Sequence, residues 1–374
     1  MFNSFRKYIK RTLSTIATVS IIAVTTFSVT ANVSAAASDS STAPKAAWPD
    51  APSITCESAI LIDADTGSIL YEKDSHQKAY PASTTKILTG LLTIENCNLN
   101  DTMTFSSKAA NSVNPYEDAN LSMKAGEQIT VEQALYGLLL YSANEIAYGL
   151  AEQVAGSADA FIDMMNNKAK ELGAINTHFA NPSGLYNPNH YTTAYDMAMI
   201  ARGCYNNASF VNIDSTSSSY TIPATNMSAQ RTIKHRHKML KGREFYYEYC
   251  KGGKTGFTDE SLMTLVTFAE KDGMRLICVV FRSPDDSTRY IDTRALFDWG
   301  FGNFKKSTTS NSQISSLFST DNYYSSDVFG KSKLGFNLNA SFITIPANGS
   351  TSDVTMDINT DYDVSNSNDK LTAK

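Results

Sequence analysis

The order of strand-like and helix-like patterns along the chain constrains its fold more than any other feature. Residues 58–74, "SAILIDADTGSILYEKD", alternate apolar and polar positions on both sides of Asp65-Thr66-Gly67, which is typical of a β-hairpin. Strand patterns return from about residue 245, in "FYYEYCKGGKTGF", "SLMTLVTFAEKDG" and "MRLICVVFRS". A helical stretch lies between them. This order predicts one mixed α/β unit whose sheet joins both ends of the domain.

The helical stretch has apolar residues at helical spacing and recognisable helix ends. Gly173 is placed to stop one helix, and a threonine is placed to cap the start of another. The predicted helices cover about 83–94, two segments within 131–154 that meet at "YSAN", 159–172, a segment that begins near Thr192 or Thr193, and about 288–299.

The first residues are typical of a secretory signal peptide. "FRKYIKR" carries four basic residues and no acid, and an uncharged run and the small residues "ANVSAAAS" follow it. We expect cleavage after Ala35 or Ala37 and export of the chain; an uncleaved membrane anchor is the alternative. Loss of the four basic residues changes the formal charge from −5 to −9 (−5 − 4). This charge argues against a nucleic-acid partner and against electrostatic adhesion to anionic lipids.

Composition suggests how the rest of the chain is divided. A stretch rich in Ser, Ala and Pro precedes the hairpin, and the composition shifts to Ser, Thr and Asn after Phe304, with short β-like runs. The last residues, "SNSNDKLTAK", have no apolar face that could form an amphipathic membrane anchor. The predicted parts are a signal peptide at 1–35, a linker at 36–55, a main α/β domain at 56–304, and a small or incomplete β-rich domain at 305–374.

The five cysteines are scattered and include no CxxC pair, so they do not indicate a zinc site. An odd number in an exported protein leaves at least one free thiol. Cys278 lies in the apolar run "LICVV" and is predicted to be in the core. A disulfide between Cys250 and Cys278 is left open by the sequence.

The stretch "PASTTKILTG" places Ser83 and Lys86 three residues apart at a predicted helix start. Residues at this spacing share one helix face, so the lysine amine can approach the serine hydroxyl. Burial or a second cation would lower the lysine pKa and make the amine a base. The pair alone is a weak signal, because Ser75 and Lys78 have the same spacing, and a solvated helix start is the alternative.

Two further stretches strengthen this interpretation. Ser142-Ala143-Asn144 interrupts two apolar helices, and Lys254-Thr255-Gly256 lies in a strand-like run. Each has an ordinary alternative, a helix–helix loop or a hairpin turn, and Ser112-Val113-Asn114 repeats the spacing of the first. Together, and in this order, the SxxK, Ser-x-Asn and KTG elements are the set found in penicillin-binding proteins and class A β-lactamases.

Over residues 56–304 the chain resembles the low-molecular-weight penicillin-binding proteins, which are serine D-alanyl-D-alanine carboxypeptidases. "ILIDADTGSILYEKDSHQKAYPASTTKILTGLLTIE", "GLLLYSANEIAYGLAE", "THFANPSGLYNPNHYTTAYDMAMIAR" and "WGF" carry the resemblance. It implies an α/β (α+β) fold of the β-lactamase/transpeptidase type. In that fold helices flank an antiparallel sheet and form a helical subdomain; a small β-rich C-terminal domain is added here.

The resemblance also implies roles for four catalytic side chains. Ser83 would be the acylated nucleophile and Lys86 the base that activates it. Ser142 would relay a proton to the leaving D-alanine, and Asn144 would orient Lys86 and the substrate backbone.

The remaining site residues would bind the substrate. Lys254 would supply positive charge, Thr255 would bond the substrate carboxylate, and Arg289 would assist as a carboxylate-binding arginine. The backbone N–H groups of Ser83 and Phe257 would form the oxyanion hole, with Gly256 beside them in the KTG element.

The implied substrate is a peptidoglycan stem peptide ending in D-Ala-D-Ala, at the outer face of the membrane or in the cell wall. β-Lactams are the expected covalent inhibitors, and no cofactor or metal is expected. His235 and His237 lie in "KHRHK", which we interpret as basic and exposed rather than as a metal site. His190 is interpreted as a packing residue, because Lys86 already serves as the base. Asp259-Glu260-Ser261 departs from the small residues usual after KTG and puts substrate fit at that edge in doubt.

Two other functions fit parts of the pattern. A β-lactamase of the same fold would need an efficient deacylating water, and no convincing Glu-x-x-Asn segment lies between Asn144 and Lys254. A catalytically silent wall-binding module is the second alternative, against which the complete set of catalytic side chains argues.

Overall fold

The structure is a computed structural model that describes residues 47–308 and 342–350. These residues belong to one compact unit, Lys45–Lys374. The predicted signal peptide and most of the predicted linker and C-terminal domain lie outside the described residues. Within the described ranges, no helix is both long enough and apolar enough to span a membrane.

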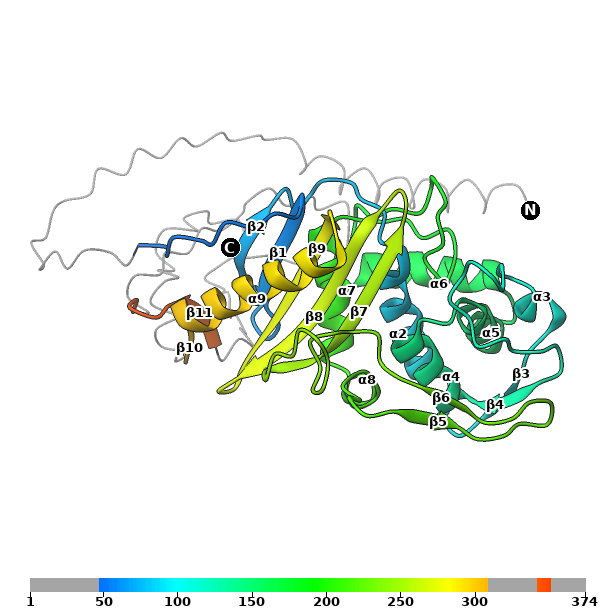
Figure 1. Ribbon diagram of the computed structural model, residues 1–374. Helices are drawn as coiled ribbons and strands as arrows, with labels where there is room; N and C mark the ends of the chain where they lie inside the picture. Colours follow the sequence, from blue (N-terminus) through cyan, green and yellow to red (C-terminus); the bar gives the residue numbers. More distant parts are fainter. Residues whose placement is uncertain (1–46, 309–341, 351–374) are drawn as a thin grey trace, which may run out of the picture. The chain divides into compact units, whose positions relative to one another are not determined.

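Five antiparallel strands form the main sheet, in the order β2-β1-β9-β8-β7 (Figure 1). The first hairpin and the last three strands meet in this sheet because β1 pairs with β9 from Ser58↔Phe281 to Asp63↔Leu276. The prediction that one sheet joins both ends of the unit is therefore confirmed. The strands are β1 (Ser58–Asp63), β2 (Ile69–Lys73), β7 (Cys250–Thr258), β8 (Leu262–Lys271) and β9 (Met274–Ser283).

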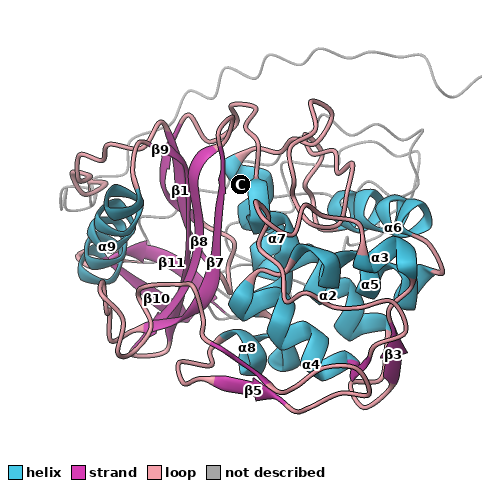
Figure 2. Ribbon diagram, turned by 45° about the vertical axis from the view of Figure 1, so that its right-hand side comes forward, coloured by secondary structure: helices cyan, strands magenta, loops and turns pink. Residues whose placement is uncertain are grey.

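Helices cover both faces of this sheet (Figure 2). The last helix, α9 (Asp286–Asn303), packs on one face, and α7 (Ala194–Tyr205) packs on the other together with the remaining helices. Successive residues of a strand point to opposite faces, so Ala59 and Leu61 belong to the core cluster under α9 while Ile60 belongs to the cluster under the helical layer. Each buried aliphatic side chain contributes roughly 1.5–3 kcal/mol, which fixes the register of β1.

The centre of the helical layer is α2 (Lys86–Asn96), which packs against α5 (Asn144–Ala155) and α7. All residues of α2 from Lys86 to Thr93 are buried. A helix enclosed on all sides removes even its polar residues from water. The first residue of α2 is therefore desolvated by its place in the fold.

The remaining elements complete the helical layer and three small two-stranded sheets. They are η1 (Ala82–Thr85), β3 (Thr102–Thr104), α3 (Ser107–Ala110), β4 (Gln128–Thr130), α4 (Val131–Tyr136), η2 (Gly137–Tyr141), α6 (Ala158–Glu171), α8 (Ala208–Asp214), β5 (Tyr220–Ile222), β6 (Arg231–Ile233), β10 (Phe304–Thr308) and β11 (Phe342–Pro346).

Helix ends follow the capping residues that the sequence offers. Thr193, rather than Thr192, caps α7, because its side chain accepts the backbone N–H of Asp196 at 3.0 Å. The predicted strand near residue 245 begins only at Cys250. Before it, Arg294 of α9 donates to backbone oxygens of the 245–246 segment, so these carbonyls bond a side chain instead of a neighbouring strand.

All five cysteines are free, including Cys250 and Cys278, whose pairing the sequence left open. Cys278 is fully buried, as predicted for a core residue. Burial raises the pKa of its thiol, so the group remains protonated and behaves as a small apolar side chain.

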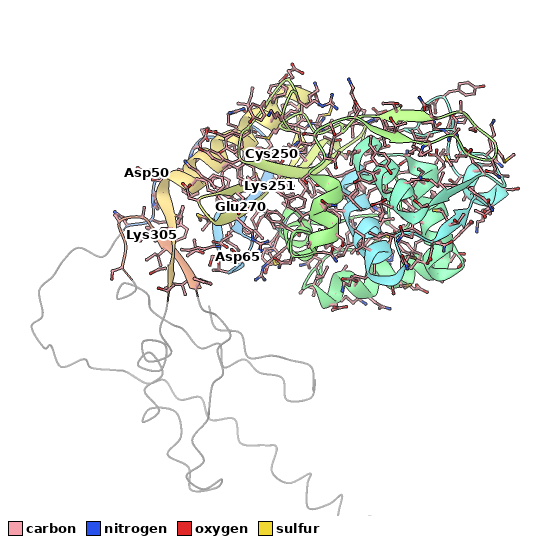
Figure 3. The ribbon with its side chains drawn as sticks, turned by 90° about the horizontal axis from the view of Figure 1, so that it is seen from below. Asp50, Asp65, Cys250, Lys251, Glu270 and Lys305 are labelled. Carbon is pink, nitrogen blue, oxygen red and sulfur yellow. The ribbon has the colours of Figure 1, made fainter. Side chains whose placement is uncertain are left out.

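Carboxylates tie the strand pair β10–β11 to one end of the main sheet. Asp65 bonds both Arg275 and Lys306, and Asp63 accepts a hydrogen bond from Thr344 of β11 at 2.9 Å. Figure 3 labels Asp65 and Lys305 near this end, with Cys250 where β7 begins. The candidate active site lies at the other end of β7.

Candidate active site

Ser83 lies in a one-turn 3-10 helix, η1, that leads directly into α2. A Cβ added at Gly184 would lie 1.9 Å from the Ala82 carbonyl oxygen, and one added at Gly256 would lie 2.9 Å from the Ser83 nitrogen. Ala82 has a φ of 48°, in the left-handed region that few residues other than glycine adopt. The turn is therefore held between a loop and the sheet edge, which fixes the position of the Ser83 hydroxyl.

The amine of Lys86 has three oxygen neighbours. Its Nζ lies 2.8 Å from Ser83 Oγ, 2.6 Å from Asn144 Oδ1 and 2.5 Å from the backbone oxygen of Ser183. The side chain is fully buried. Burial, and then the positive charges of Lys254 and Arg236, hold the pKa of Lys86 well below its usual value.

Ser142 follows α4 and the π-helical turn η2, and it adopts a left-handed conformation with a φ of 69°. This strained conformation ends the helical run, and α5 starts two residues later at Asn144. The backbone N–H of Asn144 donates to Ala119 at 2.8 Å, which fixes the start of α5. The serine hydroxyl and the asparagine amide are thus presented from a rigid break between two buried helices.

Lys254 connects the sheet edge to this break. Its Nζ donates to Ser142 Oγ at 2.9 Å and to the backbone oxygen of Thr255 at 2.8 Å, and its side chain is buried. Burial and the neighbouring charges of Arg236 and Arg289 lower the pKa of Lys254 to about 7, although Asp214 opposes them. Both the charged and the neutral form of this amine are therefore accessible near neutral pH.

A cleft of about 600 Å³ opens above these groups. Lys86 and Lys254 lie beneath its surface, and the exposed Phe257 stands at its rim. Because β7 is the edge strand of the sheet, its outer backbone groups are available to an extended ligand. The predicted site residues that line the cleft are Ser83, Ser142, Asn144, Thr255, Gly256, Phe257 and Arg289.

Arg289 reaches the cleft from the first turns of α9. Its guanidinium donates to the backbone oxygens of Gly256 and Thr264, both at 3.1 Å, and pairs with Asp286. Its Nε has no hydrogen-bond partner among the described residues. The structure therefore brings all nine predicted site residues to one cleft or directly beneath it.

Two parts of the candidate site were not identified from the sequence. Arg236 lines the cleft and lowers the pKa of both buried lysines; it lies in the basic run "KHRHK". The loop 181–185 supplies the Ser183 carbonyl that bonds Lys86, and Asn181 holds this loop by accepting the N–H groups of Ser183 and Gly184. The turn-rich letters "NPSGL" marked a loop, but a backbone acceptor leaves no signal of its own.

The interpretation of His235 and His237 as exposed is wrong, because both rings are buried. In an extended segment alternate residues point to opposite sides, so the basic neighbours face water while the two histidines face the core. Within the described part of the chain, no group of three or more His, Cys, Asp or Glu side chains is arranged to hold a metal ion.

His190 is also buried, and it contacts Thr85 at 2.8 Å and the backbone N–H of Ala180 at 3.1 Å. Burial, with smaller contributions from His178 and Lys86, lowers the pKa of His190 to about 3, so the ring is neutral at physiological pH. The unusual residues 259–261 form the turn between β7 and β8, where Ser261 bonds Thr258, and they do not line the cleft.

Comparisons with known proteins agree with this architecture. A family model described as D-alanyl-D-alanine carboxypeptidase matches residues 45–285. D-alanyl-D-alanine carboxypeptidase DacF of Bacillus subtilis is 34% identical over 254 residues, covering 67% of this chain and 63% of DacF. DacB2 of Mycobacterium tuberculosis is 34% identical over 259 residues, covering 68% of this chain and 84% of DacB2.

Solved structures show the same fold. The crystal structure of the Streptomyces K15 DD-transpeptidase has a TM-score of 0.63 at 28% identity, covering 68% of this chain and 100% of that one. The crystal structure of a D-alanyl-D-alanine carboxypeptidase from Mycobacterium tuberculosis H37Rv has a TM-score of 0.61 at 32% identity, covering 71% and 96%. These neighbours confirm the predicted β-lactamase/transpeptidase-like fold.

The match does not extend over whole relatives, because the chain spans 63% of DacF and 64% of DacC of Escherichia coli, slightly less than two thirds of each. It does cover the part of the candidate cleft from Ser83 through Thr258, and Arg289 lies just beyond the matched residues. The resemblance predicted from the SxxK, Ser-x-Asn and KTG elements is confirmed: the chain belongs to the D-alanyl-D-alanine carboxypeptidase family.

Proposed function

We propose that this protein is a serine D-Ala-D-Ala carboxypeptidase that removes the terminal D-alanine from peptidoglycan stem peptides through an acyl-enzyme on Ser83. The observation that carries this proposal is the set of three oxygen atoms around the buried Lys86 amine. Family membership and the shape of the cleft support it.

The three neighbours of Lys86 fit a neutral amine. Asn144 Oδ1 and the Ser183 carbonyl can only accept hydrogen bonds, so they take the two N–H bonds of a neutral amine. The lone pair then faces the third neighbour, Ser83 Oγ, at 2.8 Å. The depressed pKa of Lys86 makes this neutral form available at physiological pH. Lys86 is therefore the general base for Ser83.

Acylation follows from this geometry. Ser83 Oγ attacks the carbonyl carbon of the penultimate D-alanine while its proton moves to Lys86 Nζ. The C–N bond of the terminal D-alanine then breaks, and Ser142, which is hydrogen-bonded to Lys254, relays the proton held by Lys86 to the leaving amine, so that Lys86 is neutral again and Ser142 keeps its hydroxyl. Water hydrolyses the ester, which releases the shortened peptide and restores the serine hydroxyl.

The backbone N–H groups of Ser83 and Phe257 stabilise the oxyanion of the tetrahedral intermediate. The absence of a side chain at Gly256 supports this assignment, because any Cβ there would lie 2.9 Å from the Ser83 nitrogen and crowd the approach to it. Glycine in the KTG element thus keeps a donor accessible to the developing negative charge.

The free carboxylate of the substrate binds at the positive end of the cleft. Lys254 and Arg289 supply charge there, and Thr255 supplies a hydroxyl. β-Lactams present a carboxylate at the corresponding place and acylate Ser83. Asn144 orients both Lys86 and the peptide, which lies along the edge of β7.

The family acts on peptidoglycan, and we extend this to an exported enzyme at the outer face of the membrane or in the cell wall. Its signal peptide is residues 1–35 and its linker is residues 36–55. Residues 56–304 form the catalytic domain, and residues 305–374 form a small β-rich C-terminal domain.

The test is release of free D-alanine from a diacyl-Lys-D-Ala-D-Ala peptide by the purified protein, together with intact-mass analysis after addition of penicillin. We expect D-alanine release and a long-lived penicillin adduct, both lost in Ser83→Ala. Ser75→Ala is the matched control, because Ser75 has the same spacing to a lysine but bonds Glu72. Rapid penicillin turnover without an adduct would indicate a β-lactamase, and absence of D-alanine release from the wild type would indicate a wall-binding module.

A further inference from the structure

A buried carboxylate–imidazole pair lies behind β7 and has no role in the chemistry proposed above. Asp214, the last residue of α8, and His235 are both buried, and Asp214 Oδ1 lies 3.5 Å from His235 Nε2. Neither atom has a hydrogen-bond partner within normal distance among the described residues. Because an unpaired buried polar atom destabilises the folded state, we expect each of these two atoms to be the hydrogen-bond partner of the other.

The second oxygen of Asp214 bonds the strand that carries Lys254. Asp214 Oδ2 accepts the backbone N–H of Gly253 at 2.6 Å. An added Cβ at Gly252 would lie 2.5 Å from Asp214 Oδ2, and one at Gly253 would lie 2.1 Å from the Val266 carbonyl oxygen. Glycine at 252 thus allows the strand to approach the carboxylate, and glycine at 253 allows it to pack closely against β8. The carboxylate bonds the backbone of Gly253, the residue directly preceding the lysine.

The hydrogen bonds of His235 define which ring nitrogen carries the proton. Its Nδ1 accepts the backbone N–H of His237 at 3.0 Å, so the proton of the neutral ring is on Nε2 and faces Asp214. His237 repeats this arrangement: its Nδ1 accepts the backbone N–H of Met239 at 3.3 Å and its Nε2 faces Thr267 at 2.9 Å. His235 therefore directs a donor at Asp214 without adding a positive charge.

Asp214 is the negative charge that opposes the positive charges around Lys254. Burial, Arg236 and Arg289 all disfavour the protonated amine, and Asp214 is the acidic group of the described residues that favours it. Two thiols near Asp214 stay protonated, because burial raises their pKa values. The titratable and charged groups that face Asp214, His235 or Lys254 are Lys86, Cys204, Arg236, His237, Cys250 and Arg289.

We propose that Asp214, oriented by His235, is a positioning residue that holds the β7 backbone beside Lys254 and favours the charged form of the Lys254 amine while the cleft is empty. The value of this charge for catalysis rests on the carboxypeptidase function proposed above. The effect of Asp214 on the protonation of Lys254 does not depend on that function, so the proposed function and this effect can be tested separately.

The direct test is an NMR titration of Lys254 through its ¹³Cε resonance in lysine-labelled protein, assigned with Lys254→Arg. In the wild type we expect a midpoint of about 7. In Asp214→Asn the amide keeps the shape but not the charge, and we expect the midpoint to fall by about one pH unit. Only about a tenth of Lys254 would then be charged at pH 7 instead of half, so penicillin acylation should slow about fivefold.

Asp196→Asn is the matched control. Asp196 is equally buried, accepts the backbone N–H of Asn176 at 2.6 Å and also has one oxygen without a partner among the described residues, but it is not among the groups that act on Lys254. We expect this variant to leave the Lys254 midpoint unchanged.

His235 provides a second, independent variant if Asp214→Asn does not fold. His235→Leu removes the donor that orients the carboxylate and should lower the Lys254 midpoint, whereas His235→Gln can still donate to Asp214 and should restore it. A Lys254 midpoint that stays at the wild-type value in folded Asp214→Asn, or in folded His235→Leu, overturns the proposal. Absence of D-alanine release from the wild type would instead overturn the proposed function and leave the titration result standing.

Discussion

Lys254 donates a hydrogen bond of 2.9 Å to the hydroxyl of Ser142, which joins the edge strand of the sheet to the helical layer at the candidate active site. On the other side of the cleft floor Lys86 lies 2.8 Å from Ser83. Two buried amines are thus each paired with a serine hydroxyl. Like charges disfavour each other at short range, so the positive charge of Lys254 favours the neutral form of Lys86, which is the form that the proposed general base requires.

The contact between Lys254 and Ser142 predicts a large loss of acylation in Ser142→Ala. Removal of this hydroxyl interrupts proton transfer to the leaving group, and general acid–base steps of this kind contribute about 10²–10⁴-fold. The second-order rate constant for penicillin acylation, measured by stopped-flow fluorescence or by timed intact mass, should fall by that order.

Ser112→Ala is the control for this prediction. Ser112-Val113-Asn114 repeats the Ser-x-Asn spacing, but the Ser112 hydroxyl bonds the backbone of Ala109 and does not line the cleft. Its acylation rate should match the wild type. Equal rates for Ser142→Ala and the wild type would show that Ser142 is a structural residue.

The two depressed lysine pKa values predict a bell-shaped pH profile for D-alanine release. kcat/KM should rise with pH as Lys86 loses its proton, and should fall again near pH 7 as Lys254 loses its own. A bound carboxylate favours the charged form of Lys254, so the falling limb should lie at higher pH in kcat than in kcat/KM. Lys254→Arg keeps its charge at all these pH values and should lose the falling limb; an unchanged limb in this variant would assign it to another group.

The spacing of Ser83 and Lys86 alone was a weak signal, and the predicted site came from the SxxK, Ser-x-Asn and KTG elements together and from the family resemblance that they carry. Ser83 and Lys86 meet because i and i+3 share a helix face, and the order of strands predicted that both ends of the unit share a sheet. Depth of burial could not be predicted in the same way. Lys86 is fully buried because other elements enclose α2, among them the loop that carries Ser183, 97 residues later. A backbone carbonyl has no sequence signature at that distance.

The segment "KHRHK" shows why charge alone was misleading. Its basic residues suggested a solvated run, yet His235 and His237 are buried and Arg236 lies at the cleft. A period of two was present in the sequence, with Ile233 continuing the buried side, and this is the pattern of an extended segment with one covered face. The period was more informative than the net charge.

The close approach of β7 to η1 predicts that Gly256→Ala inactivates a folded protein. The new Cβ would lie 2.3 Å from Thr264 Oγ1 and 2.9 Å from the Ser83 nitrogen, so the edge strand must shift away from the oxyanion-hole donors. Loss of one such donor costs about 10²–10³ in kcat. We expect a loss of this size in D-alanine release, with Gly302→Ala as control, because a Cβ at Gly302 meets no atom within 4 Å. Full activity in Gly256→Ala would mean that this strand tolerates displacement.

The last prediction concerns stability away from the cleft. Glu127 is buried and its two oxygens accept hydrogen bonds from Arg231 of β6 at 2.8 and 3.1 Å, and one of them also accepts from Thr225 at 2.7 Å. Burial alone would raise the pKa of Glu127, but these bonds outweigh it and lower the pKa from 4.5 to about 2. The folded state therefore favours the carboxylate, and the stability it provides is complete above the unfolded pKa and is lost as the pH falls towards the folded value.

Glu127→Gln should accordingly lower the free energy of unfolding by roughly 2 kcal/mol at pH 7. The difference from the wild type should shrink as the pH falls from about 5 to 3. In this range the carboxylate of the unfolded wild type binds a proton, which favours unfolding and removes the stability that the charged group provides. Urea unfolding followed by circular dichroism at several pH values measures both quantities. Glu171→Gln, which removes an exposed carboxylate that pairs with Lys168, should change the free energy by less than about 0.5 kcal/mol at any of these pH values. A difference between Glu127→Gln and the wild type that stays constant from pH 7 to pH 3 would show that Glu127 stabilises the fold through its shape and hydrogen bonds rather than through its charge.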